Sequence, residues 1–184
     1  MSNKDFVQGL TSILVKRKIF SADEAKTLQK NFAEASQERF DDFLLDEGMI
    51  DKEDLLLALG EYYQTPAVDL AGYFFQTFLI RKFPKDVMIR NFFIPLEVDQ
   101  NFMIVAAGEP DNPELLSIIG KYLSYDVQFR SAIKQEIVNS VQEFYDKSDT
   151  EIDEEWAAYD AYGDENVYEI GADEEYSSPG EEED

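Results

Sequence analysis

Residues 3–64 carry hydrophobic side chains three to four positions apart, which is the spacing of one face of an α-helix. The pattern predicts four short helices separated by turn residues. The face of the first helix is expected to hold Phe6, Val7, Leu10, Ile13 and Leu14. Ser21 with Glu24 predicts a capping box for the second helix, and Asp51 is expected to cap the fourth. Pro66 ends the helical region because proline cannot continue a helix.

The helical pattern repeats after about thirty residues, which indicates an internal duplication. The segment Leu10–Leu14, followed by Ile19–Ser21, corresponds to Phe40–Leu44, followed by Met49–Asp51. Each copy reads as a helix, a turn and a capped second helix. We therefore predict a four-helix unit, built from a duplicated helical hairpin, over residues 1–66.

Residues 67–146 change to a mixed pattern that contains strands. Phe92–Val98 is β-branched and aromatic, and Pro95 within it indicates an edge position. A turn separates it from a second apolar strand, Phe102–Ala107, and a third is expected near residues 126–133. Helices are predicted over residues 84–90, 113–123 and 134–145. The helix after Pro113 is expected to bury Leu115, Leu116, Ile118, Ile119 and Leu123. The order α-β-β-α-β-α predicts a small α/β sandwich, so the fold class of the chain is α+β.

Charge separates a third region from the first two. The chain has 184 residues, with 40 Asp and Glu against 16 Lys and Arg, which gives a formal charge of −24. Residues 147–184 hold 16 of these acids and a single lysine, Lys147. Such a segment buries too little apolar surface to offset the entropy of ordering it, so we predict a disordered acidic tail.

The acidic tail also contains aromatic residues, and two interpretations of them stay open. Ile152, Trp156 and Tyr159 are spaced as on one helical face. In the first interpretation the tail only keeps the protein in solution. In the second, Trp156, Tyr159 and Tyr162 anchor a short motif that folds on a basic, apolar groove of a partner protein.

Composition excludes several kinds of chemistry. The absence of cysteine and histidine removes disulfides, thiolate or imidazole metal sites, and nucleophiles or bases of these two types. A chain this acidic binds nucleic acid and anionic lipid poorly. No stretch reaches the ~20 apolar residues of a membrane helix, and no signal peptide is recognisable, so we expect a cytoplasmic protein. Most carboxylates are expected on helix surfaces or in the tail, so we expect neither catalysis nor a metal site.

Several motifs, in a fixed order, resemble those of one family. They are Arg39–Leu59, Pro66–Leu70 (Pro-Ala-Val-Asp-Leu), Ile94–Val98 and Val105–Pro110. Over about residues 5–146 the sequence is similar to the N-terminal domain of the type II secretion and type IV pilus assembly ATPases, also called the MshEN domain. The resemblance implies a regulatory domain that stands alone, because no Gly-x-x-x-x-Gly-Lys-Ser/Thr loop of a motor domain is present.

The resemblance also implies a ligand, cyclic di-GMP, bound through two copies of a leucine-rich motif. The second copy keeps five of eight motif positions, and these are the candidate ligand-binding residues: Arg39, Leu44, Gly48, Leu55 and Leu59. Its other three positions hold Phe40, Asp41 and Tyr62. The first copy keeps only Leu10 and Leu14, with Gly9 at its arginine position and Lys18 at a glycine position. The alternative interpretation is that the leucines only pack the helices, since Asp41 would repel a dianionic ligand.

These observations lead to one functional hypothesis and two alternatives. The first is a non-catalytic adaptor or regulator that docks on protein components of a secretion, type IV pilus or motility machine, without a cofactor. The second is a cyclic di-GMP receptor that uses the retained motif copy. The third is that the acidic tail imitates nucleic acid on a partner protein.

Overall fold

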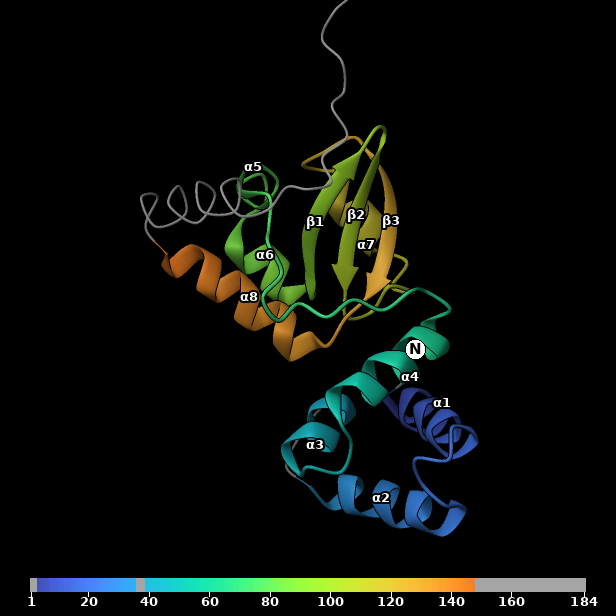
Figure 1. Cartoon of the computed structure of the whole chain (residues 1–184). Coiled ribbons are helices and arrows are strands. Elements are labelled where there is room, and N and C mark those ends of the chain that lie inside the picture. The colour runs from blue at the N-terminus through green and yellow to red at the C-terminus, as the bar shows by residue number, and fades with distance from the viewer. Residues whose placement is uncertain (1–2, 36–38, 148–184) are drawn as a thin grey trace, which may run out of the picture. The chain divides into compact units, whose positions relative to one another are not determined.

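The computed structural model describes residues 3–35 and 39–147, and its first four helices repeat one hairpin (Figure 1). They are α1 (Asn3–Lys16), α2 (Ala22–Glu34), α3 (Phe40–Asp46) and α4 (Lys52–Tyr63). The two hairpins bury one shared apolar cluster, to which α1, α3 and α4 contribute residues that are almost fully buried. The predicted four-helix unit is confirmed.

The duplication extends to the backbone of the two turns. Lys18 after α1 and Gly48 after α3 both have a left-handed backbone, with φ of 63° and 62°. In each turn the following amide closes the helix end: Ile19 donates to the carbonyl of Leu14 at 3.0 Å, and Met49 to that of Leu44 at 2.9 Å. This is the Schellman pattern of helix ends.

The predicted helix caps are confirmed in one case and only partly in the other. The side chain of Ser21 accepts a hydrogen bond from the amide of Glu24 at 3.3 Å, and the carboxylate of Glu24 accepts one from the amide of Ser21 at 2.7 Å. This is the predicted capping box. Asp51 does occupy the cap position of α4, but its side chain accepts no capping hydrogen bond.

A three-stranded sheet forms the centre of the second half. Strands β1 (Phe93–Asp99) and β2 (Phe102–Ala107) are antiparallel, and β3 (Asp126–Ser131) runs parallel to β2. The order β1-β2-β3 puts β1 at an edge, as Pro95 predicted, and the pairing shifts in register between Pro95 and Glu97. The described residues form eight helices in addition to this sheet, which confirms the fold class α+β.

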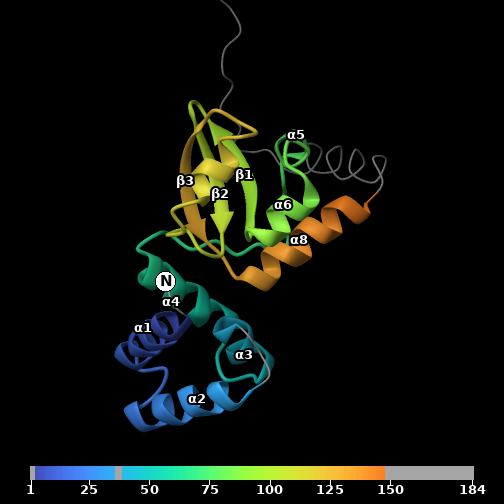
Figure 2. The same cartoon turned by 180° about the vertical axis from the view of Figure 1, so that it is seen from behind.

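Four helices accompany the sheet: α5 (Thr77–Ile80), α6 (Lys85–Arg90), α7 (Leu115–Ile119) and α8 (Lys134–Asp146). Helices α5, α6 and α8 lie on the β1 side, whereas α7 lies behind the strands in Figure 1 and in front of them in Figure 2. The four-residue helix α5 was not predicted, because it is too short to show a helical period. The expected burial of Leu116 is wrong: α7 has only five residues, and Leu115 and Ile119 face the core while Leu116 is 54% exposed.

The segment after α4 has a structural role in the sheet. The amide of Ser131, at the end of β3, donates to the carbonyl of Pro66, and the amide of Val68 donates to the carbonyl of Ser131, both at 2.9 Å. The beginning of the Pro66–Leu70 motif thus pairs with the end of the β3 edge. Leu70 then enters the second apolar cluster, which fills the space between the sheet and its helices.

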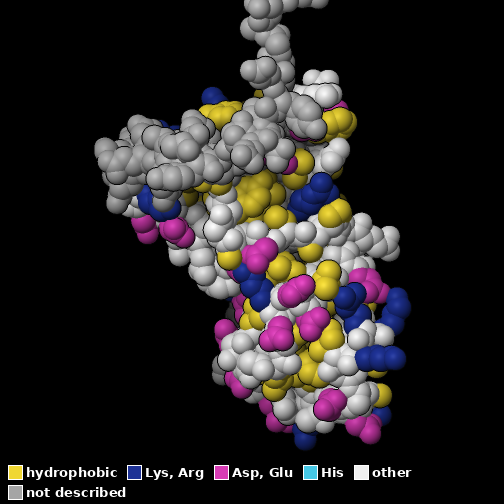
Figure 3. All heavy atoms as spheres, in the orientation of Figure 1, with side chains coloured by type: hydrophobic (Ala, Val, Ile, Leu, Met, Phe, Trp, Pro, Cys, Tyr) yellow, Lys and Arg dark blue, Asp and Glu magenta, His cyan; other side chains and the backbone are white. Residues whose placement is uncertain are grey.

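Residues 148–184 lie outside the described part of the chain, so the disorder predicted for the acidic tail stays a prediction. The domain boundary predicted after residue 66 stays a prediction. Among the described helices, none combines the length and the apolar character needed to cross a membrane. In the view of Figure 3, acidic and basic side chains are interspersed over α1–α4 rather than separated into two faces.

Candidate functional site

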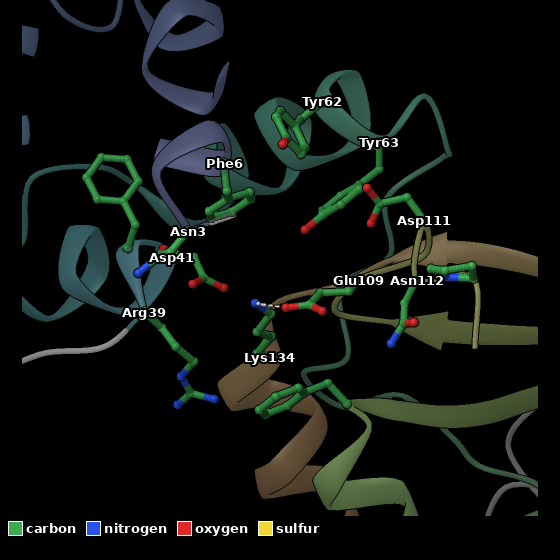
Figure 4. A pocket seen from close by; sticks show the side chains of 13 residues that line it. Asn3, Phe6, Arg39, Asp41, Tyr62, Tyr63, Glu109, Asp111, Asn112 and Lys134 are labelled. Atoms are coloured by element: carbon green, nitrogen blue, oxygen red, sulfur yellow. Dashed lines mark ion pairs between the residues drawn. The ribbon is translucent and has the colours of Figure 1, made fainter. Parts of the chain in front are cut away.

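A pocket of about 850 Å³ lies where the four-helix unit meets the sheet-bearing half (Figure 4). Its walls come from the start of α1, the start of α3, the end of α4, the loop over residues 109–113 and the start of α8. We call it the aromatic pocket, because five of its lining residues are Phe or Tyr. Segments far apart in the sequence therefore supply its walls.

Lys134, the first residue of α8, is a buried cation in this pocket. Its ammonium group pairs with the carboxylate of Glu109 at 2.7 Å and lies 5.5 Å and 5.6 Å from the ring centres of Phe6 and Phe92. Gly108 makes room for its aliphatic stem, since a Cβ at position 108 would lie 2.4 Å from Cγ of Lys134. The glycine of the Val105–Pro110 motif is thus explained by the path of one lysine side chain.

Arg39 is the second cation of the pocket, and it too is already engaged. Its guanidinium forms an ion pair with Asp42, donates to Oε1 of Gln135 at 2.7 Å and lies 5.3 Å from the ring centre of Phe92. The ring of Phe92 therefore contacts both cations. The backbone of Phe92 has a φ of 47°, a conformation that is rare and strained for an aromatic residue.

Three aromatic rings pack together to form another wall of the pocket. Phe6 and Tyr62 meet edge to face at 5.1 Å between ring centres, Tyr62 and Tyr63 at 4.8 Å, and Phe6 stacks on Tyr63 at 6.2 Å. Tyr62 can occupy its place only because residue 9 is glycine: a Cβ there would lie 2.5 Å from its ring. The two departures from the motif, Gly9 in the first copy and Tyr62 in the second, are therefore sterically linked.

Carboxylates give the pocket a negative field. Asp41 is 2% exposed, and its Oδ1 has no hydrogen-bond partner in the part of the chain that the structure describes. In Figure 4 its carboxylate points into the pocket. Burial raises the pKa of the Tyr63 hydroxyl, and the charges of Asp111, Glu109 and Asp41 raise it further. The pKa of Tyr62 is raised in the same way, by burial and then by Asp111 and Asp5.

A smaller pocket of about 600 Å³ lies on the other side of Arg39. Asp42 and Glu136 line it, and each has one buried carboxylate oxygen without a hydrogen-bond partner among the described residues. Burial and the neighbouring charge of Asp41 raise the pKa of Asp42 to about 6, against the opposing effect of Arg39. In the described residues, no three Asp or Glu side chains are arranged to hold a metal ion.

Only one of the five candidate ligand-binding residues lines the aromatic pocket. That residue is Arg39, whereas Leu44, Leu55 and Leu59 are at most 1% exposed within the helical core, and Gly48 lies in an exposed turn. Their places agree with the alternative interpretation, in which the leucines pack the helices. The three candidate anchors of the tail, Trp156, Tyr159 and Tyr162, lie outside the described residues.

The residues of the site that sequence reasoning missed include Phe6, Phe92, Asp111 and Lys134. Phe6 reads as one more apolar residue of an amphipathic helix. Phe92 reads only as the start of a strand and Lys134 as the start of a helix, because their roles in the pocket depend on segments that are adjacent only in the fold. One signal was present, since Gly108 between a strand and a turn marks a close approach of another group.

The fold defines the class of the protein as a small α+β domain preceded by a duplicated helical hairpin. Residues 63–151 match the MshEN domain family, the family that the motifs of the sequence resemble. A structure of MshE with cyclic di-GMP aligns with a TM-score of 0.59 and 18% identity, covering 74% of this chain and 98% of that one. A structure of the N-terminal domain of XpsE aligns with a TM-score of 0.52 and 12% identity, covering 77% and 95%. No curated protein matches this chain.

Proposed function

We propose that this protein is a non-catalytic regulatory domain of the cytoplasm that docks on protein components of a secretion, type IV pilus or motility machine. The MshEN match supports the class of machine. The docking role rests on one observation, the paired cations and aromatic walls of the aromatic pocket. Its two cations are held by Asp42 and Glu109, and its walls are aromatic rings of the kind that anchor protein interfaces.

The arrangement of charges in the pocket supports docking rather than catalysis. General acid–base catalysis needs a titrating group that faces the place of a substrate. Asp42, whose pKa is raised to about 6, is paired with Arg39 and lines the smaller pocket instead. The aromatic wall and the ion pair of the buried Lys134 with Glu109 shape a surface without supplying a nucleophile.

In the family that the sequence resembles, the N-terminal domain contacts the cytoplasmic part of the inner-membrane assembly platform, and this part is the partner for the direct test. We expect the purified full-length protein to bind the purified cytoplasmic domain of that platform with a dissociation constant of about 10 µM or tighter in calorimetry. Tyr63→Ala should weaken this binding at least about tenfold, because Tyr63 is a central ring of the pocket. Leu57→Ala, at an exposed position of α4 away from the pocket, is the matched control. Absence of binding, or equal loss in both variants, would argue against docking through this site.

A cyclic di-GMP receptor is the second candidate, and one observation favours it. Arg39 and Tyr62, the first and last positions of the second motif copy, both line the aromatic pocket. The family match does not reach the motif, because it begins at residue 63. Titration of cyclic di-GMP into the full-length protein tests this candidate. Binding that Arg39→Ala abolishes supports it, and absence of binding removes it.

A reversion experiment sharpens this test. Tyr62 fills space that Gly9 leaves open, so Gly9→Arg alone should clash with the ring of Tyr62 and destabilise the fold. The double variant Gly9→Arg, Tyr62→Gln restores the motif residue at both positions and removes the clash. If the lost motif residues explain weak or absent binding, the double variant should bind cyclic di-GMP more tightly than the natural sequence does.

A further inference from the structure

The aromatic pocket has a carboxylate that needs a hydrogen-bond donor. A buried carboxylate oxygen without a partner is costly, and such groups in native structures call for an explanation. Oδ1 of Asp41 has this status, although Lys134 and Arg39 line the same pocket. Lys134 is paired with Glu109, and Arg39 with Asp42. The donor that Asp41 lacks is therefore neither of these two cations, and water or a bound group has to supply it.

A second carboxylate of the pocket is also without a cation. Asp111 lies in the loop between β2 and α7 and lines the pocket, and none of the ion pairs found among the described residues includes it. Both Asp41 and Asp111 act on Tyr63, whose hydroxyl pKa their charges raise together with burial and Glu109. Once the existing ion pairs are counted, the pocket presents two unneutralised carboxylates and so attracts a cation.

The walls of the pocket favour a flat cation. The rings of Phe6, Tyr62 and Tyr63 pack together on one side of the pocket, and Phe6 also contacts the ammonium group of Lys134. A guanidinium stacks on such rings and is weakly hydrated, and its forked N–H groups match carboxylate oxygens. An ammonium is compact and strongly hydrated, and Phe6, Phe92 and Glu109 already hold one, that of Lys134.

We infer that the aromatic pocket receives a guanidinium group, which donates to Asp41 and Asp111 and stacks on the tyrosine wall. On the proposed docking function, this group is an arginine side chain of the partner protein, inserted as the central anchor of the interface. The inference deepens the proposed function and rests on it for the source of the arginine. The preference of the pocket for a guanidinium is a property of this chain alone.

The test uses two small probes that differ in charge but not in shape. N-acetyl-arginine methylamide carries the guanidinium, and the corresponding citrulline compound carries a neutral ureido group. In amide chemical-shift titrations of the full-length protein, we expect the arginine probe to shift resonances of the pocket loops, with a millimolar or tighter dissociation constant. The citrulline probe should bind at least about tenfold more weakly, because it lacks the charge that the two carboxylates require.

Variants of the two carboxylates locate the site. Asp111→Asn, at an exposed position that does not threaten the fold, and Asp41→Asn should each weaken binding of the arginine probe at least about tenfold. Asp99→Asn, an exposed carboxylate at the end of β1, should leave it unchanged. Equal binding of the two probes, undiminished binding by Asp111→Asn, or displacement of the arginine probe by cyclic di-GMP would each overturn the inference.

The outcomes also separate the inference from the proposed function. If the arginine probe binds as expected but the platform domain does not, the guanidinium site stands and the docking partner is wrong. If the platform domain binds and Asp111→Asn leaves that binding unchanged, docking stands and the guanidinium anchor is wrong.

Discussion

Residues 18 and 48 occupy the same turn position in the two hairpins, but only one of them is glycine. A left-handed backbone is strained for any residue with a Cβ, and glycine adopts it without that strain. We predict that Lys18→Gly raises the free energy of unfolding by about 0.5 to 1 kcal/mol. Gly48→Ala should lower it by about 1 kcal/mol through the backbone alone, since a Cβ there meets nothing within 4 Å.

Urea unfolding measures both changes, and Lys26→Gly is the control. Lys26 is an exposed lysine inside α2, where glycine should lower the free energy of unfolding by about 1 kcal/mol. Substitution by glycine is thus expected to raise the free energy of unfolding at Lys18 and to lower it at Lys26. A loss of stability in Lys18→Gly would show that the side chain of Lys18 contributes more than its backbone costs.

The raised pKa of Asp42 leads us to predict that the stability of the protein depends on pH. Burial and Asp41 raise this pKa from 3.8 to about 6, while Arg39 opposes the shift and Asp46 adds to it. The folded protein then binds this proton more tightly than the unfolded chain does, so stability falls as the pH rises from about 4 to 6. Asp42→Asn should raise the free energy of unfolding at pH 7 by about 1 to 2 kcal/mol, and this advantage should disappear near pH 4.

The measurement is urea unfolding of the natural and variant proteins at several pH values, with their difference plotted against pH. Taking the difference removes the contribution of the carboxylates that do not interact with Asp42. If the variant is less stable at neutral pH, the ion pair with Arg39 outweighs the cost of burying Asp42.

At the scale of elements, one lysine connects three segments of the chain. Lys52 begins α4 and pairs with Asp69, in the segment before the sheet, and with Glu136 of α8, both at 2.5 Å. Lys52→Met should lower the free energy of unfolding by about 1 kcal/mol, because partly buried charges are left without their partner. In a double-mutant cycle with Glu136→Gln, we expect a coupling energy of about 0.5 to 1 kcal/mol.

The exposed pair Lys30–Glu34 serves as the control for that cycle. Its charged groups are 3.9 Å apart on the surface of α2, so its coupling energy should stay below about 0.5 kcal/mol. Equal couplings for the two pairs would mean that Lys52 does not link the elements it contacts.

The sequence predicted those helices and strands in which the hydrophobic pattern repeats often enough to be recognised. The helices of the duplicated hairpin show several turns of regular spacing, and β1 and β2 show β-branched runs around a turn. Helix α5 has four residues and α7 has five, so neither is long enough to repeat the helical period, and for this reason α5 was missed and Leu116 was placed wrongly. The site was less predictable, because Arg39 belongs to a local motif while Phe92 and Lys134 reach it only through the fold.

At the scale of the whole molecule, charge is distributed very unequally. Residues 1–147 hold 24 acidic and 16 basic residues, a formal charge of −8, and the remaining 37 residues bring the total to −24. Residues 1–147 also form one compact unit, distinct from residues 148–184. Removing residues 148–184 should therefore leave one cooperative unfolding transition, with a free energy of unfolding within about 0.5 kcal/mol of the full chain at high salt.

The same truncation should act strongly on binding to a basic partner. Sixteen carboxylates leave with the removed segment, so the affinity should fall and should depend less steeply on salt. Substituting Trp156, Tyr159 and Tyr162 by alanine in the full chain leaves the charge unchanged and tests the aromatic anchors separately. If this triple variant binds as the natural protein does, the segment acts through charge alone. If truncation abolishes cooperative unfolding, residues 148–184 belong to the fold.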